Sequence, residues 1–239
     1  MIYTYQSRVR YSEVDENAVM TLFSLINNLQ DCCTFHGEDS GVGLAWNTAR
    51  GQAWIVADLQ MQIARYPRFG ERITVITWAE SLRGLIARRN FRVESQKGAY
   101  LAEAATEWVL MDMIRQKPLR IPQEQIDGYG VHPDKKTEHD LGQRKILLPE
   151  ERKPEEPFSI QEYHLDTNRH VNNAQYVRLA VRYLPSDFTI HHLRVEFRKQ
   201  AMLGDVIVPS LAFSEDGNSC VICLADTEGD VYFAAECRK

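Results

Sequence analysis

The chain repeats itself, and this internal repeat constrains its fold more than any other feature of the sequence. An Asp-x-Asn turn follows an apolar residue at Val14-Asp15-Glu16-Asn17 and again at Leu165-Asp166-Thr167-Asn168. A Gly-acid turn occurs at Gly70-Glu71 and again at Gly204-Asp205. The Asp-x-Asn copies are 151 residues apart (15 to 166), and the Gly-acid copies are 134 apart (70 to 204). The repeat therefore predicts two related units in one chain, with 17 more residues between the two turns of the first unit.

A helical pattern follows each Asp-x-Asn turn. Apolar residues at spacings of three and four give the first segment one apolar face; they are Leu22, Leu25, Ile26, Leu29 and Cys33. The second segment has a similar pattern, and Pro185 is expected to stop its helix; its residues are Tyr176, Val177, Leu179, Ala180 and Tyr183. Asp and Asn just ahead of these segments are good N-cap residues. Each turn is therefore expected to lead directly into a helix.

Alternating apolar and polar residues predict strands after each helix. One such strand precedes each Gly-acid turn, near Leu59 and near Leu193. Three more follow in each copy and are separated by turns that contain glycine, which is typical of antiparallel meanders. In the first copy they are Thr74–Glu80, Arg88–Glu94 and Ala102–Met113, and in the second Val206–Phe213, Ser219–Asp226 and Val231–Cys237.

Each copy thus has the pattern of a strand, a long helix and four antiparallel strands. A sheet with one apolar face buries that face by wrapping around the helix, which is the hotdog arrangement. We therefore predict an α+β fold, a tandem double hotdog, with an N-terminal hotdog domain at residues 1–113 and a C-terminal one at residues 158–239. Residues 114–157 contain six prolines and many charges, so we predict a linker with short helices there.

Composition and charge exclude several functions. A net charge of −5 argues against a general nucleic-acid binder. No stretch approaches the roughly 18 apolar residues of a membrane span, and the segment from Met1 to Gln6 lacks the regions of a signal peptide. We therefore expect a cytoplasmic location without membrane insertion. Cys220 and Cys223 form a C-x-x-C pair within an apolar strand-like run. Positions three apart on a strand face opposite ways, so these cysteines are expected to be buried apolar side chains rather than a metal site.

The two Asp-x-Asn turns differ in their chemistry. The second continues to His170, where the first has Val19. Asp166, Asn168 and His170 place a carboxylate, an amide and an imidazole within about one turn of each other at a predicted helix N-terminus. Such groups can orient a water and remove its proton, and helix N–H groups can stabilise charge on a carbonyl oxygen. No G-x-S-x-G serine motif occurs. The second turn therefore predicts hydrolysis of an acyl group with water or a carboxylate as the attacking group.

Longer segments match one known family in the same order along the chain. The most specific is Asp166-x-Asn168-x-His170-Val171-Asn172-Asn173. The others are 29–31 (LQD), 65–71 (RYPRFGE), 105–112 (ATEWVLMD) and 196–200 (EFRKQ). With these segments, which span almost the whole chain, it resembles the acyl-acyl-carrier-protein thioesterases, plant enzymes and bacterial relatives that end fatty-acid synthesis. The resemblance implies two fused hotdog domains that hydrolyse the thioester joining a fatty acyl chain to a carrier protein. It implies neither a metal nor an organic cofactor.

The resemblance also implies roles for individual residues. The Asp, Asn and His of the family motif carry over to Asp166, Asn168 and His170. Plant members have Glu-Cys after the following strand, whereas this chain has Gln200-Ala201, so a thiol nucleophile is excluded there. The amide of Gln200 can hold a water or a carbonyl by hydrogen bonds. Asp166 is then the expected base or nucleophile, and the choice between Asp166 and His170 as proton acceptor stays open.

A fatty acyl substrate needs an apolar slot, because each buried CH₂ contributes roughly 0.8 kcal/mol. The expected substrate-binding residues are Leu22, Leu25, Ile26, Leu29, Trp54, Trp108, Asn172 and Asn173. The preferred acyl chain length does not follow from them.

Carrier proteins are acidic, so docking on this acidic chain needs a local basic patch. Candidates are Arg83, Arg88, Arg89, Arg178, Arg182, Arg194, Arg198 and Lys199, although a pair such as Arg88-Arg89 is most often simply solvated. One alternative is an acyl-coenzyme A thioesterase, which would prefer coenzyme A to the carrier. Another is a non-catalytic acyl-binding module in which Gln200 marks a lost site. A hotdog dehydratase would need a different placement of its histidine and acid. Two hotdogs in one chain mimic the usual hotdog dimer, so a monomer or a homodimer is expected.

Overall fold

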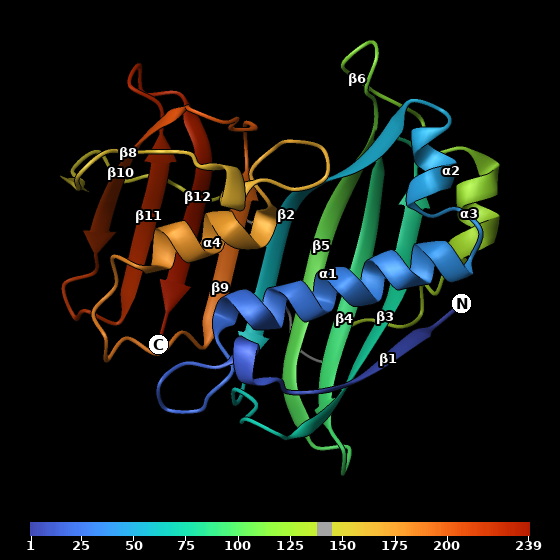
Figure 1. The fold of residues 1–239 in the computed structure, drawn as a ribbon, viewed down its shortest axis with the longest axis horizontal. Coiled ribbons are helices and arrows are strands. Elements are labelled where there is room, and N and C mark those ends of the chain that lie inside the picture. Colours follow the sequence, from blue (N-terminus) through green and yellow to red (C-terminus); the bar gives the residue numbers. More distant parts are fainter. Residues whose placement is uncertain (138–144) are drawn as a thin grey trace. The chain divides into compact units, whose positions relative to one another are not determined.

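The computed structural model describes residues 1–137 and 145–239, and its chain divides into two compact units. The first comprises Met1–Ala57 and Met61–Leu141, and the second comprises Asp58–Gln60 and Gly142–Lys239. Each unit contains an antiparallel sheet with a helix across one of its faces (Figure 1). This architecture confirms the predicted α+β hotdog fold.

The sheet of the first unit has the strand order β1-β3-β4-β5-β2. Its strands are β1 (Tyr3–Arg8), β2 (Gln52–Ile63), β3 (Arg72–Arg83), β4 (Ile86–Ser95) and β5 (Tyr100–Asp112). The short strand β6 (Lys117–Pro118) pairs with β5. Strands β3, β4 and β5 form the predicted meander, in which each predicted strand largely coincides with the observed one.

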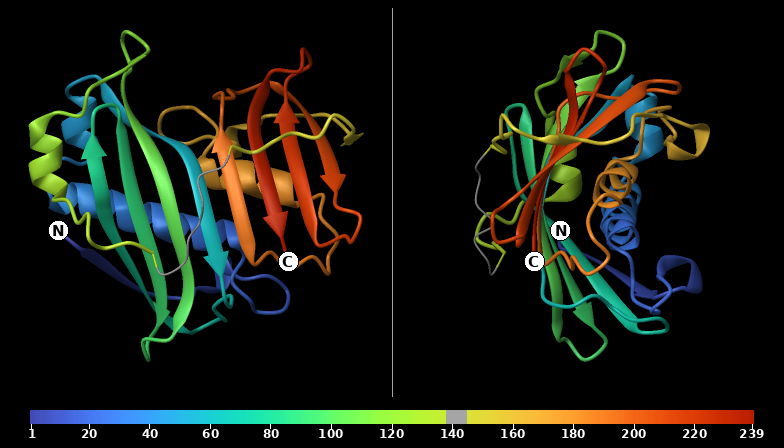
Figure 2. Two further views of the ribbon diagram at one scale, coloured as in Figure 1. Left: turned by 180° about the vertical axis from the view of Figure 1, so that it is seen from behind. Right: turned by 90° about the vertical axis from the view of Figure 1, so that its left-hand side faces the viewer.

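Helix α1 (Leu22–Asp39) lies across this sheet and contacts β3 and β1 (Figures 1 and 2). It begins at the N-cap Thr21, whose hydroxyl oxygen accepts the Ser24 N–H at 3.1 Å. The predicted apolar face is buried, with Leu25 wholly inaccessible. The face continues through Cys32 rather than the expected Cys33, since Cys32 is the wholly buried one of the two. The Cys32 thiol contacts the Val75 carbonyl oxygen of β3 at 3.5 Å.

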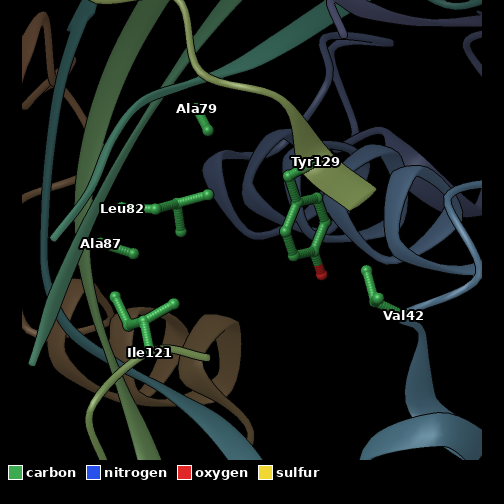
Figure 3. Close-up of a cluster of buried hydrophobic side chains, with 6 residues drawn as sticks. All are labelled: Val42, Ala79, Leu82, Ala87, Ile121 and Tyr129. Atoms are coloured by element: carbon green, nitrogen blue, oxygen red, sulfur yellow. The ribbon is translucent and has the colours of Figure 1, made fainter. Parts of the chain in front are cut away.

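Part of the predicted linker packs on the first unit. Helix α3 (Gln123–Tyr129) follows β6 and contacts α1 and β3. Ile121 and Tyr129 are only 6% exposed. They belong to a buried cluster, here called the Tyr129 cluster, with Val42, Ala79, Leu82 and Ala87 (Figure 3). Val42 precedes the short helix α2 (Leu44–Thr48). The core of the first unit therefore includes residues beyond its last long strand.

The sheet of the second unit has the strand order β9-β12-β11-β10, and β7 and β8 both pair with β10. Its strands are β7 (Lys153–Pro154), β8 (Phe158–Ser159), β9 (His192–Phe197), β10 (Val206–Phe213), β11 (Ser219–Ala225) and β12 (Val231–Arg238). Helix α4 (Asn173–Val181) contacts β11 and β12. It has 9 residues, half the 18 of α1, and ends before both Tyr183 and Pro185.

The two units pair their strands in the same register. Arg8 of β1 pairs with Arg72 of β3, and Ser159 of β8 pairs with Val206 of β10. These positions differ by 151 (8 to 159) and 134 (72 to 206), the same offsets that separate the turns of the repeat. The internal repeat in the sequence is therefore a repeat of backbone structure.

The C-x-x-C pair lies within β11, as predicted. Cys220 and Cys223 are each 1% exposed, and burial raises the pKa of the Cys220 thiol to about 11. Cys220 lies opposite Phe213 and Cys237, whereas Cys223 lies opposite Ser210 and Ala234. Both thiols are therefore core side chains.

Candidate active site

The turn that holds Asp166 is closed by its own carboxylate. Oδ1 of Asp166 accepts the backbone N–H groups of Asn168 at 2.8 Å and of His170 at 3.2 Å. The Asp166 N–H donates to the His170 carbonyl at 2.8 Å. Arg169 has a φ of 62°, the left-handed conformation that lets the chain reverse. The sequence thus folds locally into a tight Asx turn that fixes all three candidate residues relative to one another.

Helix α4 starts immediately after this turn. Asn172 is its N-cap, and its side-chain oxygen accepts the Ala174 N–H at 2.8 Å. The Asn172 N–H donates to the His164 carbonyl at 2.9 Å. The turn and the helix N-terminus, with its partial positive charge, therefore lie next to each other as expected.

The turn of the first unit has the same backbone structure. Oδ1 of Asp15 accepts the N–H groups of Asn17 at 2.9 Å and of Val19 at 3.0 Å. Ala18 has a φ of 58°, as Arg169 does at the equivalent position. Asp15 and Asp166 thus have the same structural role. At the last position of the turn, the second unit has the imidazole of His170 where the first unit has the Val19 side chain.

The two carboxylate oxygens of Asp166 differ in their hydrogen bonds. Across residues 1–137 and 145–239, Oδ2 of Asp166 accepts no hydrogen bond. The Asp166 side chain is half-buried, and His170 is half-buried as well. The carboxylate is therefore held in place through one oxygen while the other is available to a substrate or a water.

Gln200 lies in the loop that follows β9, beside this turn. The Val171 N–H, next to His170, donates to the Ala201 carbonyl at 3.1 Å. Gln200 itself is exposed, whereas Ala201 is wholly buried. The structure thus brings together the backbone of all four predicted catalytic residues, with Gln200 joined to the turn through its neighbour Ala201.

Tyr176 of α4 is a member of this site that the sequence did not single out. Its hydroxyl accepts the Ala201 N–H at 2.7 Å and contacts the Lys199 carbonyl oxygen at 3.3 Å. These two residues flank Gln200. The predicted helix face already placed Tyr176 in the core. The first unit has Leu25 at the equivalent position, so the hydroxyl of Tyr176 was a sequence signal for a polar role. An interpretation of the face as purely apolar missed it.

His164 is a second polar residue that was missed. It is 5% exposed, and its Nδ1 accepts the Gln161 N–H at 3.0 Å. Burial, with the charges of Arg178 and Arg182, lowers the pKa of this imidazole below its ordinary value. His164 is therefore a neutral hydrogen-bond acceptor that shapes the chain just before the Asp166 turn.

The expected substrate-binding residues fall into separate places. Four line the buried face of α1, namely Leu22, Leu25, Ile26 and Leu29. Trp54 and Trp108 are partly buried and pack against the Tyr129 cluster, to which the four α1 residues do not belong. The indole N–H of Trp54 donates to Gln125 Oε1 at 3.4 Å, and that of Trp108 donates to Thr106 Oγ1 at 2.6 Å. Asn172 and Asn173 are half-buried at the start of α4.

The structure corrects the interpretation of Arg88-Arg89 as a solvated pair. Arg89 is only 5% exposed and therefore cannot dock a carrier protein. Neighbouring positions on β4 face opposite ways, so Arg88 points outward and forms an ion pair with Glu107 at 2.9 Å. Lys199 and Arg198 are exposed but paired with Asp226 and Glu196.

The described residues contain neither a metal-binding cluster nor a membrane-spanning helix. Among residues 1–137 and 145–239, no group of three or more His, Cys, Asp or Glu side chains is placed to hold a metal ion. No helix in the same ranges is long and apolar enough to cross a membrane.

The fold and the site define a class: hotdog proteins with two units in one chain, of which the second has the acid, amide and imidazole turn. The chain belongs to the acyl-ACP thioesterase family. The N-terminal domain of that family matches residues 1–129, and its C-terminal domain matches residues 148–238. The two matched regions divide the chain much as the internal repeat does.

Individual relatives are distant in sequence. Oleoyl-acyl carrier protein thioesterase 2, chloroplastic, of Arabidopsis thaliana is 26% identical over 240 residues, covering 92% of this chain and 65% of that protein. Palmitoyl-acyl carrier protein thioesterase, chloroplastic, of Gossypium hirsutum is 23% identical, covering 92% of this chain and 56% of that protein. The chain therefore spans less than two thirds of the length of these curated relatives.

Solved structures share the fold over nearly the whole chain. A crystal structure of an acyl-ACP thioesterase from Bacteroides thetaiotaomicron has a TM-score of 0.89 at 22% identity, covering 99% of this chain and 97% of that one. The 12:0-ACP thioesterase from Umbellularia californica has a TM-score of 0.84 at 20% identity, covering 99% and 96%. At these identities the likeness establishes the fold.

Proposed function

We propose that this protein hydrolyses the thioester of fatty acyl-acyl-carrier-protein, releasing a free fatty acid and ending fatty-acid synthesis. One observation carries the proposal. Two turns with the same hydrogen bonds occur in the chain, and the second has His170 where the first has Val19. A turn needs no imidazole, so the difference points to chemistry. Membership of the acyl-ACP thioesterase family supports the same reaction class.

The proposed reaction uses water as the nucleophile. Asp166 or His170 takes a proton from the water while its oxygen bonds to the thioester carbonyl carbon. Negative charge then develops on the carbonyl oxygen, where the amides of Asn168 and Gln200 and the N-terminal N–H groups of α4 can stabilise it. When the carbonyl re-forms, the carbon–sulfur bond breaks, and the leaving thiolate receives the proton from the base. No metal or organic cofactor enters this scheme.

The hydrogen bonds favour an active carboxylate at Asp166. Two backbone N–H groups hold Oδ1, which fixes the carboxylate without using Oδ2. A base must be both positioned and accessible, and Asp166 meets these conditions. His170 would then position the water or the thioester carbonyl.

The acyl chain is proposed to contact the apolar residues of the first unit. The candidates remain Leu22, Leu25, Ile26 and Leu29 of α1 with Trp54 and Trp108, while Asn172 and Asn173 would contact the thioester end. Every buried CH₂ adds roughly 0.8 kcal/mol to binding, so a fatty acyl chain can bind tightly by burial alone.

Docking of the acidic carrier is proposed to involve α4. Arg178 and Arg182 are exposed and four residues apart, so they lie on the same side of the helix axis. We also propose a cytoplasmic location. The protein is proposed to be a monomer or a homodimer.

The test is thiol release from a panel of acyl-carrier-protein and acyl-coenzyme A substrates with the same acyl groups. The variant is His170→Val, because Val19 in the first unit demonstrates that this turn accommodates valine. We expect release from the carrier substrates and a loss of about 100-fold or more in the variant.

Other outcomes would change or refute the proposal. A preference for coenzyme A would identify an acyl-coenzyme A thioesterase. Tight acyl binding without thiol release would identify a non-catalytic acyl-binding module. Equal rates for wild type and His170→Val would refute the argument that His170, in place of Val19, indicates catalysis.

A further inference from the structure

Tyr176 connects helix α4 to the loop that contains Gln200. Its hydroxyl accepts the Ala201 N–H at 2.7 Å and lies 3.3 Å from the Lys199 carbonyl oxygen, to which it can donate. The hydroxyl therefore contacts the backbone on both sides of Gln200. We infer that Tyr176 is a positioning residue, which fixes the Gln200 amide relative to the Asp166 turn.

The first unit explains why a hydroxyl is needed here. The residue equivalent to Ala201 is Pro67, and each carbonyl accepts a hydrogen bond from the residue that precedes the helix N-cap, Met20 at 2.8 Å and Val171 at 3.1 Å. Proline has no N–H, so the first unit has no backbone donor to satisfy at this buried position. It has Leu25 where the second unit has Tyr176. The pairs Leu25–Pro67 and Tyr176–Ala201 are thus two solutions for the same loop.

The second solution leaves the backbone before Ala201 free of proline. The residue before a proline is restricted to extended conformations, and in the second unit that residue is Gln200. Alanine at position 201 removes this restriction. Its backbone N–H is buried, however, and therefore needs a hydrogen-bond acceptor. The Tyr176 hydroxyl is that partner, so the Gln200 conformation is set by a side chain of α4, the helix that starts at the candidate active site.

The rest of Tyr176 is held independently of its hydroxyl. Its ring stacks on Phe233 with centroids 5.5 Å apart and meets the edge of Phe197 at 6.0 Å. Burial raises the pKa of the Tyr176 phenol above its ordinary value, so the hydroxyl keeps its proton and can donate as well as accept. Tyr176→Phe therefore removes the two loop contacts while preserving the ring packing.

The first experiment compares thioester hydrolysis by wild type, Tyr176→Phe and Tyr232→Phe. Tyr232 is a matched control, because its hydroxyl contacts Asp205 Oδ2 at 3.0 Å at the far end of the same loop. This inference rests on the proposed function, in which Gln200 contacts the reacting thioester. We expect Tyr176→Phe to lower kcat about tenfold or more with KM within about twofold, and Tyr232→Phe to keep the wild-type kcat.

A swap between the units separates positioning from general loss of stability. Tyr176→Leu with Ala201→Pro installs the pair of the first unit. Ala201→Pro alone would bring the proline ring into steric conflict with the Tyr176 hydroxyl, which lies 2.7 Å from the Ala201 nitrogen. Tyr176→Leu alone leaves the Ala201 N–H without its partner. We expect the double variant to regain the thermal stability that each single variant loses, whereas its kcat stays below that of wild type, because proline at position 201 restricts the Gln200 backbone again.

The outcomes distinguish this inference from the proposed function. No thiol release by the wild type would refute the proposed function, and with it the role of Gln200. Release by the wild type with an unchanged kcat in Tyr176→Phe would overturn the positioning role alone. A wild-type kcat in the double variant would overturn it as well, because Gln200 would then be positioned without the Tyr176 hydroxyl.

Discussion

The buried pair His36 and Arg89 makes the stability of the first unit depend on pH. His36 of α1 is wholly buried, and its Nδ1 lies 3.0 Å from Arg89 Nη1 of β4. A guanidinium can only donate hydrogen bonds, so Nδ1 must be the acceptor and the imidazole must be neutral. The ring also stacks on Tyr3 at 5.1 Å and meets the edge of Tyr129 at 5.2 Å. Protonation of His36 would place two positive charges together in the core.

The structure gives the direction and the size of the effect. Burial, then the Arg89 charge, lowers the pKa of His36 from 6.5 to about 3. Below pH 6.5 the unfolded chain gains a proton at His36 that the folded protein does not bind, so stability falls as the pH drops toward 3. Without screening, the shift corresponds to about 2 kcal/mol lost by about pH 5. We therefore expect a loss of about 1–2 kcal/mol between about pH 7.5 and pH 5.

The assay is urea unfolding of wild type and His36→Asn at about pH 7.5 and pH 5. Asn does not titrate, and its amide oxygen can accept the Arg89 N–H in place of Nδ1. The variant loses ring packing at both pH values, so the informative quantity is the difference between them. Wild type should lose about 1–2 kcal/mol more than the variant on acidification. The same pH dependence in both proteins would refute the neutral, buried histidine.

Three other predictions concern the core and the site. Ile121→Ala should lower the free energy of unfolding by about 2–4 kcal/mol in urea titrations, since Ile121 is 6% exposed in the Tyr129 cluster; a change below about 0.5 kcal/mol would mean that this segment is not part of the core. Gln200→Ala should lower kcat about 10–100-fold with little change in thermal stability, because Gln200 is exposed; an unchanged kcat would remove Gln200 from the mechanism. The thiols of Cys220 and Cys223, each 1% exposed, should react with a maleimide only after unfolding, and rapid labelling of the native protein would contradict their burial.

The fold followed from local patterns in the sequence. Alternation of apolar residues located β10 at Val206–Phe213 with both of its ends, and helical spacing located the buried face of α1. These patterns depend only on which side of an element faces the core. The two offsets of the repeat, read from the Asp-x-Asn turns and the Gly-acid turns, reappear in the strand register.

What the sequence did not predict depends on contacts between distant residues. Two adjacent arginines such as Arg88-Arg89 are usually solvated, so nothing in the sequence indicated that Arg89 is buried. The burial of Arg89 depends on His36, which lies 53 positions away. Helix α3 packs on the first unit because Ile121 and Tyr129 complete a cluster whose other members precede them by tens of residues. No local pattern contains that information.

The candidate site was only partly predictable for the same reason. Asp166, Asn168 and His170 lie within one turn, so their proximity followed from the sequence. The role of Asp166 in closing the turn became clear only from its hydrogen bonds. The Tyr176 hydroxyl contacts Ala201 across 25 positions, and its importance required the comparison with Leu25 and Pro67.

The measurement that tests the central claim most directly is thioester hydrolysis by the matched variants Asp166→Asn and Asp15→Asn. Asn keeps the oxygen that closes each turn, so both variants should unfold within about 1 kcal/mol of wild type. The account predicts that Asp166→Asn lowers kcat by about 100-fold or more, whereas Asp15→Asn stays within about twofold of wild type. Equal effects of the two substitutions would show that Asp166 serves only the turn, and would contradict the assignment of the chemistry to the second unit.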